Sequence, residues 1–214
     1  MCSSDLVRGL DRFGEQAHDI ISSSTTRKAF DLSLEKTSES TRFGRHEFGQ
    51  SLLLASRLIE AGVHFVTVRL RPAEFDFDTH LDNFSKLSAL LPPFDKGLAS
   101  LIDRLKERGL FRSTAIMVAG EFGRTPKINA QGGRDHWARA MFALMAGGDV
   151  QGGQTIGETD EHAGEPVGQG YSPEDLAASF FQNIGIDPQT EFHANVGRPV
   201  TLVRDGKPIS QLFS

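Results

Sequence analysis

The sequence predicts an α/β fold in which helices flank a mostly parallel β-sheet. The expected strands are two apolar, β-branched segments, residues 63–70 and 114–119, and a long helical pattern over residues 81–108 separates them. A connection of this length normally joins parallel strands, because the chain must return to the same end of the sheet. The length of 214 residues and the hydrophobic content of 38% suffice for one sizeable core.

The composition excludes several kinds of partner. The formal net charge of -5 gives no attraction to nucleic acid or to an anionic membrane surface, so we expect neither. No apolar run approaches the roughly 20 residues that a membrane-spanning helix needs, so we expect no membrane span. The single cysteine, Cys2, excludes an internal disulfide and a metal site built from several cysteines.

Periodicity and end signals predict the remaining elements. A helix is expected from His46 to Gly62, where apolar residues recur at helical spacing. The pair Pro92-Pro93 is expected to split the pattern over residues 81–108 into two helices. A third strand is expected over residues 140–146.

Further signals lie towards both ends of the chain. Ser172-Pro173-Glu174-Asp175 predicts a helix start, with Ser172 as the cap. Asp205-Gly206 predicts a small carboxyl-terminal β-hairpin between residues 199–203 and 207–212. Residues 7–45 predict helix fragments joined by polar loops. Residues 1–6 show no structural pattern and are expected to be an artefact or a disordered start; a genuine polar terminus is the alternative.

Residues that can bind metals follow both predicted strands. Asp78 and His80 come after the first strand, Glu121 comes after the second, and Asp135-His136 lies in a glycine-rich loop further on. Because parallel strands end at the same sheet edge, Asp78, His80 and Glu121 are expected to share a rim. Carboxylates and imidazoles are ligands of zinc, manganese and magnesium. Alternatively, each histidine donates a hydrogen bond within a polar loop and each aspartate caps a turn.

Spacing separates the roles within this group. An Asp-x-His segment in extended chain puts Asp78 and His80 on one face, so both could bind one ion. Asp135 and His136 are adjacent and point apart, so we favour His136 as the ligand and Asp135 as a residue that orients it or caps the loop. Arg124 could hold an anionic substrate, or it could form a salt bridge to a carboxylate such as that of Glu121.

Three strings of residues resemble a known bacterial family, the domain of unknown function 1501. They are Phe77-Asp78-Thr79-His80, the segment from Gly120 to Asn129, and Gly133-Arg134-Asp135-His136-Trp137. The resemblance covers about residues 27–213. Family members are usually longer and often carry a twin-arginine export signal, which implies a truncated chain from a periplasmic or exported parent protein.

That family is similar in turn to the alkaline phosphatase and sulfatase superfamily. The likeness implies that residues 7–214 form a single partial domain of this fold, truncated at the amino terminus. It also implies that Asp78, His80 and His136 are metal ligands and that Glu121 stands where the superfamily has an aspartate ligand. Phe122 replaces a neighbouring histidine ligand, so one divalent ion, zinc or manganese rather than magnesium, is expected.

Two functions follow from the resemblance and remain open. The first is a metal-dependent hydrolase of phosphate or sulfate esters, inactive as this chain alone, with Glu121 as fourth ligand or base and Arg124 holding the substrate. Its substrate would be a small anionic ester or a sulfated or phosphorylated polymer. The second is a non-catalytic exported binding protein. Phe122 and the lack of an identifiable nucleophile favour the second function, whereas the clustered metal ligands favour the first.

Overall fold

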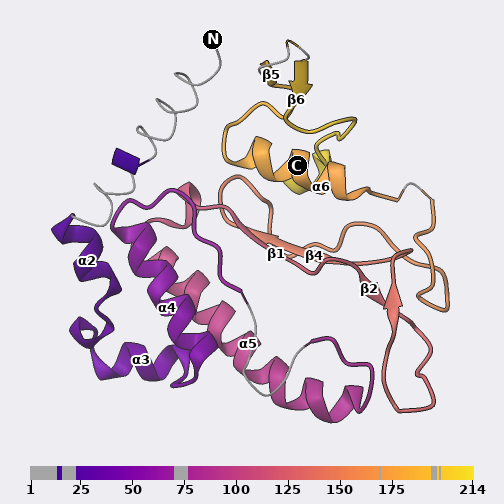
Figure 1. Ribbon diagram of the computed structural model, residues 1–214, viewed down its shortest axis with the longest axis horizontal. Helices are drawn as coiled ribbons and strands as arrows, with labels where there is room; N and C mark the ends of the chain where they lie inside the picture. Colours follow the sequence, from indigo (N-terminus) through magenta and orange to yellow (C-terminus); the bar gives the residue numbers. More distant parts are fainter. Residues whose placement is uncertain (1–13, 16–22, 70–76, 169, 194–196, 198) are drawn as a thin grey trace. The chain divides into compact units, whose positions relative to one another are not determined.

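The computed structural model describes residues 14–15, 23–69, 77–168, 170–193, 197 and 199–214 (Figure 1). The chain divides into two compact units. Unit 1 comprises the described part of Met1–Asp76 together with Ser88–Arg104, and unit 2 comprises Phe77–Leu87 and Leu105–Ser214. The predicted unpatterned start, residues 1–6, lies outside the described residues. None of the helices in the described part of the chain is both long and apolar enough to cross a membrane.

Unit 1 is helical. It contains the helices α2 (Ser24–Phe30), α3 (Thr37–Phe43) and α4 (Glu47–Glu60), a 3-10 turn at Leu32–Leu34, and part of α5 (Asn83–Glu107). The predicted helix from His46 to Gly62 is confirmed as α4. His46 caps it, because its Nδ1 accepts a hydrogen bond from the backbone N–H of Gly49 at 3.1 Å.

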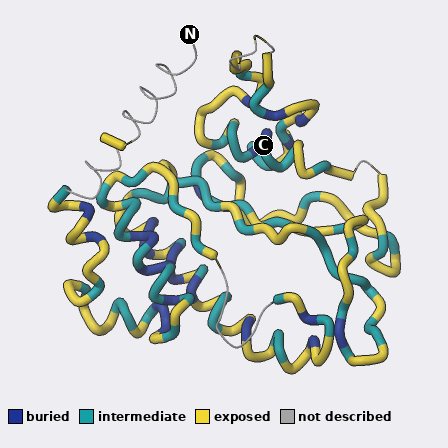
Figure 2. The backbone as a smooth tube through the Cα atoms, viewed as in Figure 1, coloured by how far each residue is buried: buried dark blue, intermediate teal, exposed yellow. Residues whose placement is uncertain are grey.

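The prediction that Pro92 and Pro93 split a helix in two is wrong, because α5 runs continuously through both prolines. Apolar residues recur at helical spacing on both sides of the prolines, and Phe94, just after them, contacts α4. The ring of Phe94 stacks on Phe48 of α4 with centroids 5.9 Å apart. Gly97 lets α4 come close, since a β-carbon there would lie 2.9 Å from Leu52. Figure 2 shows buried positions along α4 in dark blue.

A polar network also lies inside unit 1. The side chain of Arg104 is 2% exposed and donates hydrogen bonds to three glutamates. The acceptors are Glu35 Oε1 at 2.9 Å, Glu39 Oε2 at 3.1 Å and Glu60 Oε1 at 2.8 Å. The hydrogen bond from Arg104 is the main reason that the pKa of Glu35 lies below its ordinary value. The network therefore keeps the buried guanidinium paired with carboxylates.

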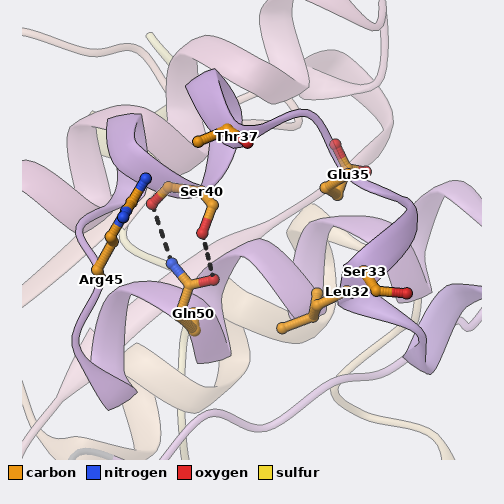
Figure 3. Close-up of a pocket in the computed structure, with 7 residues that line it drawn as sticks. All are labelled: Leu32, Ser33, Glu35, Thr37, Ser40, Arg45 and Gln50. Carbon is orange, nitrogen blue, oxygen red and sulfur yellow. Dashed lines mark hydrogen bonds between the residues drawn. The ribbon is translucent and has the colours of Figure 1, made fainter.

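A polar hollow of about 460 Å³ on unit 1 is shown in Figure 3. Its lining residues are mostly hydroxyl, amide or charged: Leu32, Ser33, Glu35, Thr37, Ser40, Arg45 and Gln50. Glu35 is paired with Arg104 and Arg57, and Gln50 exchanges hydrogen bonds with Ser40. Glu35, Ser40 and Gln50 therefore have partners within unit 1.

Unit 2 contains three separate antiparallel strand pairs. Strand β1 (Ile116–Ala119) pairs with β4 (Ala143–Ala146), β2 (Gly123–Arg124) pairs with β3 (His136–Trp137), and β5 (Glu191–His193) pairs with β6 (Pro199–Thr201). Two 3-10 turns, Phe111–Ser113 and Ser210–Phe213, complete the unit together with helix α6.

Helix α6 (Pro173–Asn183) confirms the predicted start at Ser172. The side chain of Ser172 accepts from the backbone N–H of Asp175 at 3.1 Å, and the carboxylate of Asp175 accepts from the backbone N–H of Ser172 at 2.9 Å. This reciprocal capping box satisfies two backbone donors that no helical carbonyl can reach.

The strand pairs contradict the predicted fold class. The described residues contain no parallel sheet, so the alkaline phosphatase-like α/β architecture is wrong. Residues 63–69 form no strand, although exposure alternates over residues 65–69 as in one. β-branched residues favour an extended chain, but a strand also needs a partner. Strand β1 pairs instead with β4, the next apolar segment that runs antiparallel to it.

The predicted hairpin between residues 199–203 and 207–212 is also wrong. Residues 207–209 do not pair with the preceding segment, because α6 supplies their acceptors. The backbone N–H of Lys207 donates to Asp175 Oδ1 at 2.8 Å, and that of Ile209 donates to Ser179 Oγ at 2.8 Å. Strand β6 is thereby left to pair with β5.

Candidate metal centre

Two loops of unit 2 build the candidate site. The first, residues 77–82, leads into α5, and the second, residues 125–135, joins β2 to β3. The backbone N–H of Arg134 donates to the carbonyl of Thr79 at 2.8 Å, and that of Asn83 donates to the carbonyl of Gly132 at 2.9 Å. These backbone bonds hold the Asp-x-His segment against the glycine-rich loop.

The side chain of Asn129 ties the two loops together. Its Nδ2 donates to the carbonyl of His80 at 3.0 Å and to Asp135 Oδ1 at 3.1 Å. Its Oδ1 accepts from the backbone N–H groups of Gln131 at 3.0 Å and Gly133 at 2.9 Å. An amide is the side chain that can donate two and accept two hydrogen bonds in this way.

The β2–β3 pair sets the positions of Arg124 and His136. These two residues are directly opposite in the antiparallel register. Opposite residues of such a pair project from the same face with their β-carbons about 5 Å apart. Gly123 lets the chain just after β3 lie close to β2, since a β-carbon at Gly123 would lie 1.7 Å from the carbonyl oxygen of Ala140. The register therefore places a guanidinium beside an imidazole.

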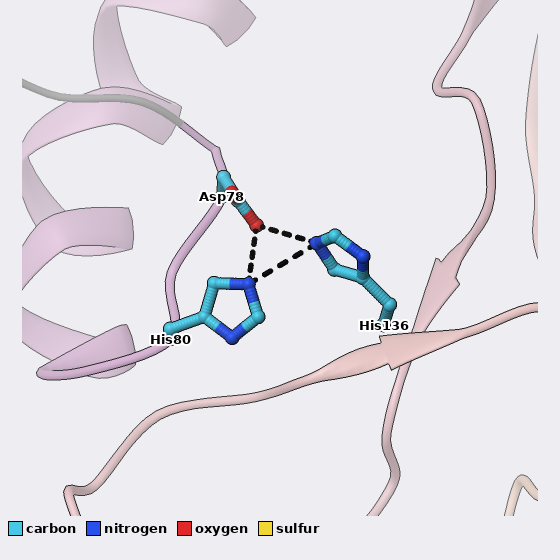
Figure 4. A group of neighbouring side chains, drawn as sticks. All are labelled: Asp78, His80 and His136. Carbon is cyan, nitrogen blue, oxygen red and sulfur yellow. Dashed lines mark hydrogen bonds and ion pairs between the residues drawn. The ribbon is translucent and has the colours of Figure 1, made fainter.

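Asp78, His80 and His136 converge on one point (Figure 4). Asp78 Oδ1 lies 3.1 Å from His80 Nε2 and 3.1 Å from His136 Nε2. The two Nε2 atoms are themselves 3.1 Å apart. The side chains are 43%, 43% and 50% exposed, respectively, so ions in solution can reach them.

Asp135 orients His80. The Nδ1 atom of His80 lies 2.9 Å from Asp135 Oδ1. The hydrogen bonds from His80 and Asn129 hold the pKa of Asp135 below its ordinary value, so this carboxylate is an ionised acceptor at neutral pH. The Nδ1 atom of His80 therefore carries a proton. In the neutral ring, the lone pair of Nε2 then faces the cluster.

Arg124 is the cation nearest to Asp78. Its Nη1 donates a charge-assisted hydrogen bond to Asp78 Oδ1. Partial burial acts to raise the pKa of Asp78, but hydrogen bonds from Arg124 and His136 outweigh it and lower the pKa below its ordinary value. Asp78 is therefore ionised at neutral pH. Of the two roles expected for Arg124, the structure has a salt bridge, with Asp78 rather than Glu121.

The geometry of the three atoms fits a metal ion. An equilateral triangle with sides of 3.1 Å has its corners 3.1/√3, or about 1.8 Å, from its centre. An ion about 1 Å above that plane lies about 2.0 to 2.1 Å from all three atoms, which is the usual distance for zinc with nitrogen and oxygen ligands. The chemistry also fits, because imidazole nitrogens and a carboxylate oxygen are donor atoms that zinc binds in proteins.

The structure does not bring Glu121 into this group. Glu121 is exposed, and it is Phe122 that contacts His136, with ring centroids 4.4 Å apart. The predicted residues Asp78, His80 and His136 are thus brought together, with Arg124 and Asp135 beside them. The role of Asn129 was missed, although it lies within the second of the three strings that carry the family resemblance.

Gly133 offers a direct test of how the loops are held. A β-carbon at Gly133 would lie 2.0 Å from the carbonyl carbon of His80, so the backbone has to move. We expect Gly133→Ala to destabilise the protein by about 1 to 3 kcal/mol, as overpacking typically does. Chemical denaturation in metal-free buffer measures this change.

Gly152→Ala is the matched control, because nothing lies within 4 Å of a β-carbon at that position. If both variants unfold at the same denaturant concentration, the close approach of the two loops is refuted.

The chain matches the family model described as a protein of unknown function (DUF1501) over residues 3–213. Searches of curated proteins and of solved structures gave no significant match. The match to the family model spans nearly the whole chain. The protein therefore belongs to the DUF1501 family.

Proposed function

We propose that this DUF1501 protein binds one divalent transition-metal ion through Asp78, His80 and His136 and uses it to hydrolyse a phosphate or sulfate ester. The observation that carries the proposal is the triangle of three ligand atoms, each 3.1 Å from the other two. Two histidines and one carboxylate are the protein ligands of several hydrolytic zinc sites, which keep a further position open for water or substrate.

A divalent ion supplies Lewis-acid chemistry, since it polarises an ester oxygen and activates water as a nucleophile. The chain provides the rest of the chemistry around it. Asp135 keeps the Nδ1 proton on His80, so that Nε2 is free to act as a ligand. Arg124 brings a fixed positive charge to the site for an anionic ester. Because water can serve as the nucleophile, no serine or threonine is needed.

A non-catalytic binding protein remains the second candidate. Phe122 packs against His136 on one side of the cluster, where a second ion would need a ligand. The hydroxyl of Thr79 donates to Asn83 at 2.6 Å, and that of Thr125 donates to the carbonyl of Lys127 at 2.9 Å. Neither acceptor is a base that could take the hydroxyl proton, so neither threonine is activated as a nucleophile.

Hydrolysis of p-nitrophenyl phosphate and p-nitrophenyl sulfate tests the proposal. The protein is stripped with a chelator and assayed before and after addition of zinc or manganese. We expect turnover that requires the ion and disappears in His80→Ala. Metal binding without turnover of either ester would favour the binding protein, and turnover that survives in His80→Ala would remove the proposed site from the reaction.

Asp135 should act on the metal through His80. We expect Asp135→Asn to weaken zinc binding by roughly 10- to 100-fold, as loss of a carboxylate behind a ligating histidine typically does. Titration with a zinc-sensitive dye measures the affinity. Asp149→Asn removes an exposed carboxylate elsewhere in unit 2 and should leave the affinity unchanged. Equal affinities in the two variants would show that Asp135 does not support His80.

A further inference from the structure

We infer that Arg124 couples metal binding to anion binding at this site. In the absence of an anion, its guanidinium is hydrogen-bonded to Asp78 Oδ1, the oxygen that the metal needs. An oxyanion that binds the guanidinium releases this oxygen to the metal. The inference rests on the proposed metal site at Asp78, His80 and His136. It adds that a tetrahedral oxyanion and the metal ion bind cooperatively, so that the site fills with both together.

The first argument is that Arg124 and a metal ion would both bind the same oxygen, Asp78 Oδ1. Arg124 Nη1 donates to Asp78 Oδ1. The same Oδ1 atom, and not the second oxygen of the carboxylate, lies 3.1 Å from both His80 Nε2 and His136 Nε2. A metal ion bound to the two histidines takes its oxygen ligand from this atom. The guanidinium and the metal ion therefore compete for Asp78.

The second argument is that Arg124 cannot move far from the site. Its backbone is paired opposite His136 in the β2–β3 register. Its guanidinium carbon lies 5.7 Å from the centroid of the Phe122 ring, and that ring packs on His136. When a metal ion takes Asp78 Oδ1, the guanidinium stays next to it as a second positive charge. Like charges at this separation repel each other, so the ion binds less tightly than three ligands alone would allow.

The third argument is that the guanidinium of Arg124 has N–H groups that can donate hydrogen bonds to an anion. A guanidinium carries five N–H donors in a planar fork. Among the described residues, Asp78 is the only hydrogen-bond acceptor found for Arg124, and the side chain is 24% exposed. A phosphate or sulfate group can accept two parallel hydrogen bonds from such a fork. The same group can contribute an oxygen to the neighbouring ion.

An oxyanion therefore relieves the competition. It gives the guanidinium a new partner, releases Asp78 Oδ1 to the metal and neutralises the charge between the two cations. By thermodynamic reciprocity, the metal tightens anion binding by the same factor by which the anion tightens metal binding. Arg124→Gln should break this coupling in a characteristic way: the metal alone binds more tightly, and the anion no longer helps.

The experiment is a titration with Mn²⁺, followed by the electron paramagnetic resonance signal of the free ion. It is run with and without inorganic phosphate at matched ionic strength, and a protein-free titration corrects for manganese phosphate in solution. In the wild-type chain we expect phosphate to lower the Mn²⁺ dissociation constant by at least about 5-fold, the lower end of typical coupling between sites. In Arg124→Gln we expect tighter Mn²⁺ binding without phosphate and less than a 2-fold effect of phosphate, roughly the size of the measurement error.

Arg139→Gln is the matched control. Arg139 is an exposed arginine of unit 2 that pairs with Glu165, so this variant makes the same change in net charge away from Asp78. It should behave as the wild-type chain does.

The outcomes separate this inference from the function on which it rests. If wild-type protein binds Mn²⁺ but phosphate changes the affinity equally in wild type and Arg124→Gln, the coupling is refuted and the metal site stands. Weaker phosphate-free binding in Arg124→Gln also refutes it, because Arg124 would then support the ion rather than compete with it. If neither protein binds Mn²⁺ with or without phosphate, the coupling fails, and the zinc titration of His136→Ala then decides whether the metal site fails as well.

Discussion

Replacing Arg104 by alanine should destabilise unit 1 by about 3 to 5 kcal/mol, the usual consequence of removing one partner from a buried ionic network. The guanidinium is 2% exposed and bonds Glu35, Glu39 and Glu60. Without it, Glu35 and Glu60 lose their buried partner, and among the described residues Glu35 keeps its ion pair with Arg57. Urea denaturation followed by far-ultraviolet circular dichroism measures the change, because unit 1 holds most of the helix.

Arg27→Ala is the matched control for this substitution. Arg27 is an exposed arginine of α2, and a surface substitution of this kind normally changes the stability by less than about 0.5 kcal/mol. A loss below about 1 kcal/mol in Arg104→Ala would contradict the buried network, since it would match the loss expected of an exposed ion pair.

His136→Ala should weaken zinc binding by more than about 100-fold, which exceeds the effect of losing a residue behind a ligand. The substitution removes one of three ligands and leaves a carboxylate and one imidazole. The fold should survive, because the side chain is 50% exposed and the backbone pairing of β3 with β2 does not depend on it. Isothermal titration calorimetry measures the affinity, and thermal unfolding in metal-free buffer checks the fold.

His162→Ala controls for loss of a surface histidine. His162 is 83% exposed and lies outside the Asp78 cluster. Zinc binding that falls equally in both variants would mean that the ion attaches nonspecifically to surface imidazoles, and the proposed site would be wrong.

Local signals predicted the helices of this protein well. Helix α6 begins at Ser172, as the Ser-Pro-Glu-Asp string indicates, because capping bonds form between residues three apart. Helix α4 follows from its apolar spacing in the same way. Pro92 and Pro93 do not interrupt α5, although a proline removes a backbone hydrogen bond, so these two residues alone did not predict where the helix ends.

Strand pairing could not be read from the sequence. The composition of residues 63–70 favours an extended chain, but the choice of partner depends on contacts between distant segments. Strand β1 pairs with β4 and not with this segment, so the parallel sheet and its shared rim were wrong.

The candidate site was nevertheless found in large part, for a different physical reason. Asp78 and His80 meet His136 because two loops bind each other through backbone bonds and Asn129, not because strand ends are adjacent. Residue type pointed to Asp78, His80 and His136, which do lie together, whereas the group that could hold a metal ion does not include Glu121. The pairing of Arg124 with Asp78 depends on the β2–β3 register, which only the structure reveals.

Elemental analysis of the purified chain, expressed without a histidine tag, tests the central claim most directly. The protein is incubated with zinc and manganese, passed through a chelating resin and compared with a variant that combines Asp78→Asn, His80→Ala and His136→Ala. Iron is measured as well, because two histidines and a carboxylate also hold Fe²⁺ in some enzymes. The account predicts about one transition-metal ion per wild-type chain, the single ion that three converging ligands can hold, and almost none in the variant. Equal metal contents in the two proteins would contradict it.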